Sequence, residues 1–268
     1  MCAVINTPLD PRLTDVQQMA FERDGFLVMR QLASAERVAE MRSIALAHIE
    51  SEVAPIEYEA DVAYPGAPAS RTAEGGHTPR RLLQAHGRAP AFADWATDPR
   101  VTAVVAQLLG SGMLYLTRNH HNCIMTKHPR YSTATGWHKD LRYWHFQQPH
   151  LVNAWLALGD ETPANGCMHL LPGTHGQEFD AWRLDADQFL RADLDENRAL
   201  IASEQTVPLA PGDVLFFHAG AFHAAGRNTT DTLKLSVVTT YYTPANAPLP
   251  DTRSARLEPV LARQAQHD

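Results

Sequence analysis

The sequence predicts an α+β protein whose second half folds as an antiparallel sandwich or jelly roll. Helical patterns occur before Gly110, and many short apolar segments separated by turn residues follow it. Helices followed by a series of short strands are typical of this class. A length of 268 residues with 44% hydrophobic residues is enough for a sizeable core. We therefore expect one domain spanning residues 1–268.

The first part, residues 1–110, is expected to be mainly helical. Ser, Thr or Asp stands before each apolar-periodic run, as an N-cap requires, and Gly closes two of the three. The expected helices are Thr14 to about Asp24, Ala35 to about Glu50, and Asp98 to Gly110. A short buried strand, Phe26 to Met29, lies between the first two. These helices should pack on the sheets of the second half.

Residues 53–80 form a separate feature. They are rich in Pro, Gly, Ala and Ser and have no apolar period. Long irregular segments of this kind are usually lids or disordered loops. We expect this segment to cover the mouth of the barrel and to be poorly ordered without substrate, because few contacts would hold it.

Residues 111–243 should supply the strands of the core, and residues 244–268 a C-terminal tail. Period-two or continuous apolar runs bounded by Gly, Pro and Asn indicate the strands. The expected strands are Met113–Thr117, Asn122–Lys127, Leu151–Leu158, Met168–Leu171, Val214–Phe217 and Leu233–Tyr242. Asp185 to Ala199 is charged and is predicted to be a helical insertion. The tail from Pro244 is polar and Pro-rich, and we expect it to lie loosely on the surface.

Charge and cysteine usage exclude several classes of partner. The net charge is −7 and there is no basic run, which argues against binding to nucleic acid or an anionic membrane. No segment approaches the length of a membrane span, and Met1 to Arg12 has no signal-peptide core. Cys2, Cys123 and Cys167 are odd in number and lack CxxC spacing, which favours free thiols in the cytoplasm. The sequence makes no prediction of the oligomeric state.

The stretch Gly136-Trp137-His138-Lys139-Asp140 carries the strongest chemical signal. On an extended strand, His138 and Asp140 project from the same face because side chains alternate. One imidazole and one carboxylate, joined by a histidine from elsewhere, form the 2-His-1-carboxylate triad. That triad binds Fe(II) and leaves open positions for a cosubstrate and O2. His218 and His223 compete for the role of the second histidine.

A series of ordered motifs resembles the phytanoyl-CoA dioxygenase family of Fe(II)/2-oxoglutarate oxygenases. The motifs are Lys127-His128-Pro129, His138-Lys139-Asp140-Leu141-Arg142-Tyr143, Trp155-Leu156-Ala157-Leu158, Asn165-Gly166-Cys167, Leu171-Pro172-Gly173-Thr174-His175, Pro211-Gly212-Asp213-Val214 and His223-Ala224-Ala225-Gly226-Arg227-Asn228. The resemblance implies a double-stranded β-helix core (jelly roll, cupin-like) with N-terminal helices packed on it. It also implies iron held by His138, Asp140 and His223, since the family ligand precedes a Gly-x-Asn turn.

The resemblance further implies where 2-oxoglutarate binds. This dianion needs a cation for its far carboxylate, and Lys234 and Ser236 share one face of the last strand by alternation. The family generally has arginine where this chain has Lys234. The compact ammonium of lysine therefore replaces the planar guanidinium of arginine. The resemblance places Lys127 and Trp155 around the cosubstrate as well. Arg227 is a reserve candidate for the cation.

Further residues are candidates for contacting the substrate. His121, Cys123 and Met125 share the face of Lys127, and Arg142 and Tyr143 follow the carboxylate ligand. We therefore expect a non-haem Fe(II)/2-oxoglutarate-dependent dioxygenase that hydroxylates a small molecule with O2, releasing succinate and CO2. Two alternatives remain: an iron-dependent jelly-roll oxygenase that does not use 2-oxoglutarate, and a non-catalytic binding module on the same scaffold. Asp140 argues against halogenation, which needs a small residue at that position.

Overall fold

Two antiparallel sheets face each other in the computed structural model, which describes residues 11–62 and 64–264. The larger sheet has nine strands in the path β1-β10-β7-β12-β5-β3-β2, with β4 and β13 attached beside β12. The smaller sheet has the order β6-β11-β8-β9. The strands are β1 Phe26–Met29, β2 Ile56–Tyr58, β3 Pro79–Leu83, β4 Leu114–Leu116, β5 Asn122–Lys127, β6 Thr135–His138, β7 Val152–Ala157, β8 Met168–Leu170, β9 Gln205–Val207, β10 Val214–His218, β11 His223–Ala225, β12 Lys234–Tyr242 and β13 Val260–Arg263.

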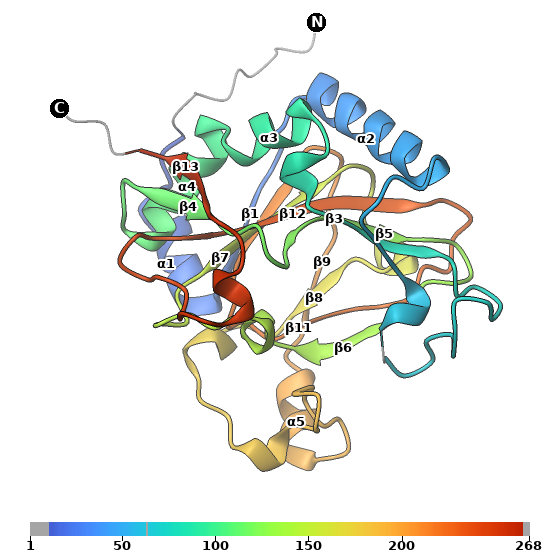
Figure 1. The fold of residues 1–268 in the computed structure, drawn as a ribbon. Helices are drawn as coiled ribbons and strands as arrows, with labels where there is room; N and C mark the ends of the chain where they lie inside the picture. Colours follow the sequence, from blue (N-terminus) through green and yellow to red (C-terminus); the bar gives the residue numbers. More distant parts are fainter. Residues whose placement is uncertain (1–10, 63, 265–268) are drawn as a thin grey trace, which may run out of the picture.

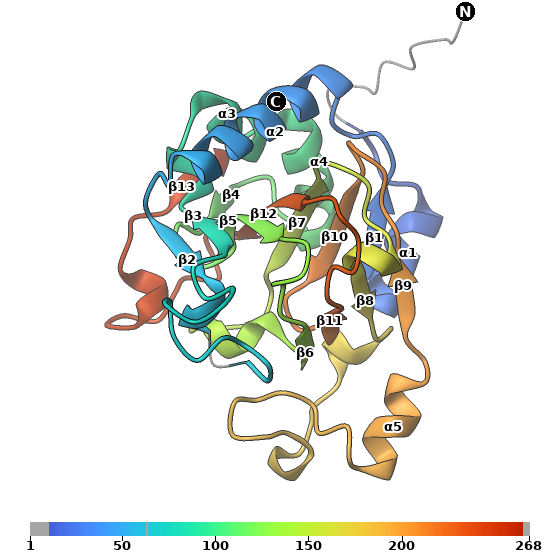
Figure 2. The same cartoon turned by 90° about the vertical axis from the view of Figure 1, so that its right-hand side faces the viewer.

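Helices cover the outer face of the larger sheet. Figure 1 shows α2 and α3 above that sheet, and the turned view in Figure 2 places the smaller sheet on the opposite side. The helices are α1 Asp15–Asp24, α2 Ala35–Glu50, α3 Pro90–Ala96, α4 Pro99–Leu109 and α5 Asp195–Ile201. Met41, Trp95 and Val104 of α2, α3 and α4 join one apolar cluster with the sheet and are fully buried. The expected arrangement of helices packed on a β core is confirmed.

Alternation along the central strands divides the apolar residues between two cores. In β10, Phe216 belongs to the cluster beneath the helices, whereas Phe217 belongs to the cluster between the sheets. Val237 and Val238 of β12 divide in the same way. Strands of the larger sheet are therefore apolar on both faces, which explains their continuous apolar runs. The space between the sheets is where polar side chains from β5, β6, β11 and β12 meet.

The predicted elements of the first part are confirmed. Thr14 forms a capping box at the start of α1, and Gly25 ends that helix with a φ of +83°. A Cβ at Gly25 would also lie 2.4 Å from the His175 ring, so glycine is needed there for two reasons. Ser34 and Asp98 cap α2 and α4. The predicted strands are present with bounds that differ by no more than one residue.

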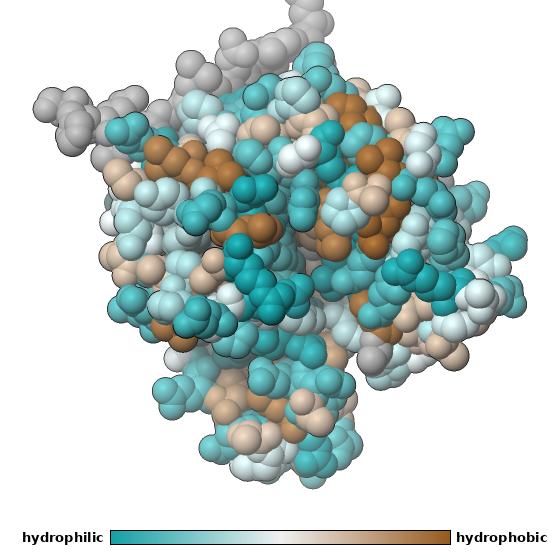
Figure 3. All heavy atoms as spheres, viewed as in Figure 1, coloured by the Kyte–Doolittle hydropathy of each residue, from teal (hydrophilic) through white to brown (hydrophobic). Residues whose placement is uncertain are grey.

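The prediction of a helix from Asp185 to Ala199 is wrong in its extent. The Asp185 carboxylate accepts hydrogen bonds from the backbone N–H groups of Asp187 (2.9 Å) and Phe189 (2.8 Å), and Gln188 adopts a φ of +61°. Side-chain acceptance of this kind competes with helix formation. Only α5, a seven-residue helix, forms afterwards. The lobe that contains α5 projects below the sandwich in Figure 1 and carries mixed polar and apolar residues in Figure 3.

The prediction of a loose C-terminal tail is also wrong for its described part. Strand β13 pairs with β4 and so joins the larger sheet. Before it, the Asn246 amide donates to the backbone oxygens of Gln148 and His150, each at 3.0 Å. These bonds fix the tail to a loop nearly a hundred residues earlier in the chain. Residues 265–268 lie outside the described residues.

Residues 53–80 are more regular than predicted. β2 pairs with β3, and β3 pairs with β5, so the segment extends the larger sheet at its edge. Glu59 and Arg80 form a buried ion pair at 3.0 Å, which holds the connection between those strands. The Pro and Gly residues of this segment masked the pattern of two short strands, β2 and β3. Their pairing depends on β5, which lies about forty residues later in the chain. The degree of order without substrate stays a prediction.

The remaining expectations concern thiols and membranes. Cys123 and Cys167 are buried and free, and Cys2 lies outside the described residues. Among the described helices, none combines the length and the hydropathy that a membrane crossing requires.

Candidate active site

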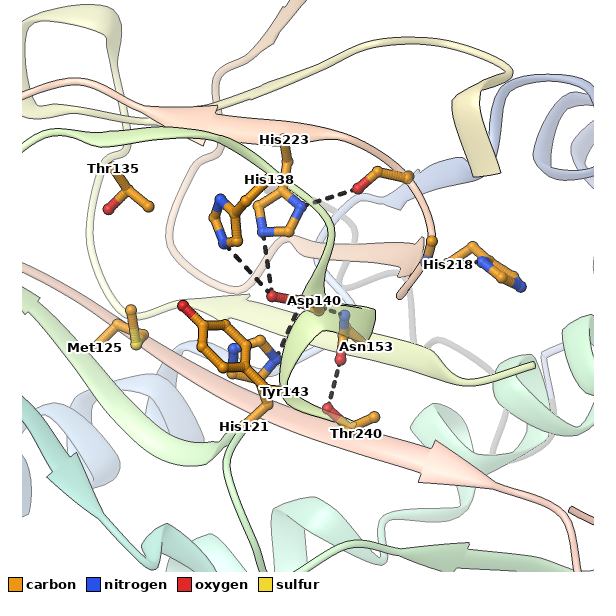
Figure 4. Close-up of polar contacts among 12 residues, drawn as sticks. His121, Met125, Thr135, His138, Asp140, Tyr143, Asn153, His218, His223 and Thr240 are labelled. Carbon is orange, nitrogen blue, oxygen red and sulfur yellow. Dashed lines mark hydrogen bonds and ion pairs between the residues drawn. The ribbon is translucent and has the colours of Figure 1, made fainter. Parts of the chain in front are cut away.

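Three predicted metal ligands meet between the sheets. His138 ends β6, and Asp140 begins the short 3-10 helix Asp140–Tyr143 that follows it. His223 begins β11 and stands opposite His138 in the strand register. Asp140 Oδ1 lies 3.6 Å from His138 Nε2 and 3.4 Å from His223 Nε2, and the three ligand atoms are within 4.8 Å of one another. Figure 4 shows both rings directed at this oxygen.

The two imidazoles are oriented by their other ring nitrogens. His138 Nδ1 lies 2.9 Å from the backbone oxygen of Gly136, and His223 Nδ1 lies 3.1 Å from that of Ala221. A carbonyl oxygen only accepts, so we assign the proton of each ring to Nδ1. In the neutral form each Nε2 keeps its lone pair, as a metal ligand must. Burial lowers the pKa of His223, but Asp140 outweighs it and raises that pKa, so a metal that binds there would displace a proton. Burial and the neighbouring His223 lower the pKa of His138 to about 4, which keeps it neutral.

Asp140 is held by one oxygen and free at the other. Its Oδ2 accepts a hydrogen bond of 2.8 Å from the Asn153 amide and lies 3.1 Å from His121 Nδ1. Asn153 in turn accepts from the Thr240 hydroxyl. Burial alone would raise the pKa of Asp140, but His121 and His223 hold it well below its usual range. Oδ1 is buried without a hydrogen-bond partner in the described part of the chain.

Removing the support of Asp140 should weaken metal binding without removing a ligand. We expect Asn153→Ala to lower the affinity for Fe(II) or Co(II) roughly 10- to 100-fold, because hydrogen bonds around ligands typically contribute that much. Titration of the metal-free protein with Co(II), followed by its absorption, measures this affinity. Asn246→Ala is the control, since that buried amide bonds backbone oxygens far from the ligands. Equal affinity of the Asn153 variant and the parent would contradict the role.

A cavity between the sheets is lined by the three ligands and, at its other end, by Lys127 and Lys234. Beside Lys234, this end of the cavity adjoins an ion pair that the sequence did not reveal. Glu161 is fully buried and lies 3.0 Å from Lys234 Nζ. It also accepts hydrogen bonds from Ser236 Oγ at 2.6 Å and Trp155 Nε1 at 2.9 Å. Three of the four predicted cosubstrate residues therefore contact one carboxylate. Lys234 has a protein counter-ion instead of the unpaired charge that we predicted.

Lys127 is the fourth predicted cosubstrate residue, and among the described residues it has no such counter-ion contact. It stands opposite Lys234 in the register of β5 and β12. Its ammonium donates to the backbone oxygen of Thr133, at 3.1 Å. Burial, followed by the charges of Lys234 and Arg80, lowers the pKa of Lys127 to about 7. Gly166 has a φ of +78°, and a Cβ there would lie 2.4 Å from the backbone oxygen of Gly226, which accounts for glycine in the Asn165-Gly166 turn.

The geometry and the sequence lead to one family. The family model "Phytanoyl-CoA dioxygenase (PhyH)" matches residues 21–235, most of the chain. The chain belongs to the PhyH family. This confirms the predicted resemblance and, at the level of the family, the prediction of a dioxygenase.

Curated relatives of this PhyH-family protein span several organisms. An "Ectoine dioxygenase" from Nocardia farcinica is 26% identical over 231 residues, which cover 80% of this chain and 72% of that protein. The peroxisomal phytanoyl-CoA dioxygenase of Rattus norvegicus is 24% identical over 249 residues, covering 85% and 68% respectively.

Solved structures confirm the predicted double-stranded β-helix. The epimerase SnoN, in complex with Fe3+, alpha ketoglutarate and nogalamycin RO, matches with a TM-score of 0.72 and 23% identity, covering 94% of this chain and 95% of SnoN. EctD from S. alaskensis with 2-oxoglutarate and 5-hydroxyectoine gives a TM-score of 0.73 at 22% identity, covering 94% and 86%. At these identities the likeness establishes the fold.

His218 and Arg227 both lie away from the ligand cluster of this PhyH-family protein. His218 was the alternative metal ligand, and Arg227 was the reserve cation for the cosubstrate. His218 Nδ1 accepts from the Gly220 backbone N–H at 2.9 Å, and its ring packs against His150 and His175. Figure 4 shows it pointing away from Asp140. Arg227 is exposed in its loop and does not line the cavity.

The predicted substrate residues divide into two groups. His121, Met125 and Tyr143 line the cavity next to the ligands. Cys123 packs in the core, where burial raises the pKa of its thiol to about 12. Arg142 stacks over the rings of Phe189 and Tyr143 outside the cavity.

Sequence reasoning missed the residues that close the cavity mouth. Tyr64, from the predicted lid, hydrogen-bonds Tyr143 through the two hydroxyls at 2.9 Å. Phe189, from the lobe, packs edge-on against Tyr64 and against His138. Arg80 and Arg81 of β3 complete the lining. The only signal for this wall was the concentration of aromatic and arginine residues in segments without a clear period.

Proposed function

We propose that this protein is an Fe(II)/2-oxoglutarate-dependent dioxygenase that hydroxylates a small-molecule substrate and releases succinate and CO2. Membership of the PhyH family supports the reaction class. The observation that carries the proposal is the convergence of His138, Asp140 and His223, with one carboxylate oxygen left free at their centre.

The donor set fits iron on its chemistry. Two neutral imidazole nitrogens and one carboxylate oxygen on one side of a centre are the facial triad of non-haem Fe(II) oxygenases. The unpartnered Asp140 Oδ1 supports this reading, because a buried carboxylate oxygen without a partner is otherwise costly. The cavity lies beside the triad, so the remaining positions of a bound metal would face it.

The protein's own residues would hold the metal, orient its ligands and keep water out of the site. Iron and 2-oxoglutarate, when bound with O2, supply the oxidising chemistry. Asn153 holds Asp140 so that only Oδ1 is available as a ligand. Phe189 and the Tyr64–Tyr143 hydroxyl pair cover the approach to the triad. A covered site protects reactive species from water.

For the cosubstrate, we assign the far carboxylate of 2-oxoglutarate to the end formed by Lys127, Trp155, Lys234 and Ser236. Glu161 neutralises the charge of one of the two lysines. With both lysines protonated, this end of the cavity therefore has a net charge of one positive unit. Lys127 supplies that surplus charge when it is protonated. A single carboxylate of the cosubstrate would make this end neutral.

The affinity for 2-oxoglutarate should therefore fall as the pH rises above about 7. The pKa of Lys127 is lowered to about 7, so the free site is charged below that pH and neutral above it. Bound carboxylate would raise this pKa again, and binding at higher pH then requires proton uptake. We expect the dissociation constant to rise by up to about tenfold per pH unit above that value.

Calorimetry on the metal-loaded protein from pH 6 to 9, in buffers of different ionisation enthalpy, measures both the affinity and the proton uptake. The other charged groups acting on Lys127 are Lys234, Arg80, Glu59 and Glu161. Lys127→Met is the control and should abolish the pH dependence along with most of the affinity. A parent protein whose affinity does not change with pH would contradict the assignment.

Several wider features belong to the same proposal. The segment around Tyr64 acts as the cover of the cavity within a single domain spanning residues 1–268. Buried free thiols at Cys123 and Cys167 support a reducing compartment, for which we propose the cytoplasm. The net charge of −7 supports a small-molecule partner over nucleic acid.

Succinate formation tests the function directly. The purified protein with Fe(II), O2 and 2-oxoglutarate should form succinate, slowly alone and faster with its substrate. Omission of 2-oxoglutarate should stop O2 consumption. Consumption of O2 without succinate would favour the iron oxygenase that does not use 2-oxoglutarate, and no turnover with any substrate would favour the binding module.

A further inference from the structure

Arg81 is a cation of the cavity that the proposed function leaves unused. It lies on β3 opposite Met125 of β5, so both side chains project from the same face of the sheet into the cavity. Its side chain is 11% exposed, and its Nε lies 3.1 Å from Glu57 Oε1. Within the described chain, its two terminal Nη groups donate no hydrogen bond to another residue.

The neighbouring Arg80 shows what a purely structural arginine does in this strand. Arg80 uses one terminal nitrogen on Glu59 at 3.0 Å and the other on Thr135 at 2.9 Å. Arg81 approaches Glu57 with its Nε, and that contact lacks hydrogen-bond alignment. A guanidinium binds carboxylates most strongly with two parallel N–H groups. Arg81 therefore keeps its best binding edge available.

The charged groups near Arg81 include more cations than carboxylates. Arg253, from the C-terminal segment, acts electrostatically on Arg81, Glu57 and Tyr143. His120 beside them is neutral, because burial and Arg253 lower its pKa to about 3. The guanidinium groups of Arg81, Arg253 and the exposed Arg256 thus outnumber the Glu57 carboxylate. This balance favours an anionic ligand.

The surroundings of Arg81 define the rest of the ligand. Met125 and Val238 supply apolar surface in the cavity, and Tyr64 and Tyr143 supply hydroxyls at its mouth. The end beside Lys234 is already assigned to the cosubstrate. A ligand held at Arg81 would then extend across apolar surface that also adjoins the metal ligands.

We propose that the substrate carries a carboxylate, which binds the free edge of the Arg81 guanidinium, and an apolar body that lies against Met125 beside the metal centre. The proposal rests on the proposed function and names the substrate class of that site. It makes Arg81 a specificity-determining residue, because an uncharged analogue would leave the guanidinium without its anion.

Matched carboxylate and amide probes test the proposal. The protein is loaded with Fe(II) and saturating 2-oxoglutarate without O2, and the visible absorption of that complex verifies loading. Phenylacetate and hexanoate are then compared with phenylacetamide and hexanamide, by calorimetry and by the change in that absorption. The variants are Arg81→Gln, Arg81→Lys, Glu57→Gln and, as a control, the exposed Arg118→Gln.

We expect the parent to bind at least one of the carboxylates roughly 10- to 100-fold more tightly than its amide. Arg81→Gln should reduce this ratio to within about twofold, Arg81→Lys should retain part of it, and Glu57→Gln should increase it. Arg118→Gln should match the parent. A parent without preference, or an Arg81→Gln variant that keeps it, overturns the proposal. Failure of the proposed function appears separately, as absence of the loaded complex before any probe is added.

Discussion

Asp140→Ala should abolish Fe(II) binding at any practical metal concentration and, with it, all succinate formation. The substitution removes the only anionic ligand of the cluster and leaves two neutral imidazoles. Changes to the hydrogen bonds around a metal ligand cost about 10- to 100-fold in affinity. Loss of the ligand itself should cost more than about 100-fold. Titration with Co(II) and the succinate assay measure the two effects.

His218→Ala is the matched control for this experiment. His218 is a partly buried histidine five residues before the ligand His223, but its ring packs against His150 and His175. Its removal should leave the Co(II) affinity within about threefold of the parent. If His218→Ala abolished metal binding and His223→Ala did not, the ligand assignment would be wrong.

Lys234→Ala should destabilise the fold as well as weaken cosubstrate binding. Glu161 is fully buried, so the substitution leaves its charge without a counter-ion. Breaking a buried ion pair from one side typically costs about 3–5 kcal/mol. We also expect the requirement for 2-oxoglutarate to rise by about 100-fold, because a charge-assisted contact is lost. Urea unfolding and the succinate assay separate the two effects.

The double variant Lys234→Met with Glu161→Gln isolates the role of Lys234 in binding. Glutamine keeps an oxygen for Ser236 and Trp155, and no buried charge is left unpaired. Most of the lost stability should return. If this stable variant bound 2-oxoglutarate as tightly as the parent, Lys234 would be structural and Lys127 alone would anchor the cosubstrate.

The convergence of the proposed central residues could be predicted because their signals in the sequence are local. His138 and Asp140 are two positions apart, and the strands that carry Lys127 and Lys234 have clear patterns. The reason given for the first pair was incomplete, however. β6 ends at His138, and Asp140 begins a 3-10 turn, so the change of chain direction contributes to their convergence.

Other features depend on distant partners and leave no local signal. Asp160 is exposed whereas the adjacent Glu161 is buried, and only the folded positions of Trp155, Lys234 and Ser236 decide between them. Likewise, β13 forms because β4 offers an edge far earlier in the chain. The pairing of β2 and β3 has the same origin. A local sequence pattern with Pro and Gly does not predict which sheet edges remain free to pair with another strand.

The pairing of His138 with His223 has a consequence for folding. These two proposed ligands stand on neighbouring strands of the smaller sheet, so a bound metal would cross-link β6 to β11. A slip of one residue would turn His223 to the opposite face and present Ala224 in its place. Metal affinity in this protein is therefore also a measure of correct strand registration. Substitutions that loosen the smaller sheet should release metal without altering any ligand.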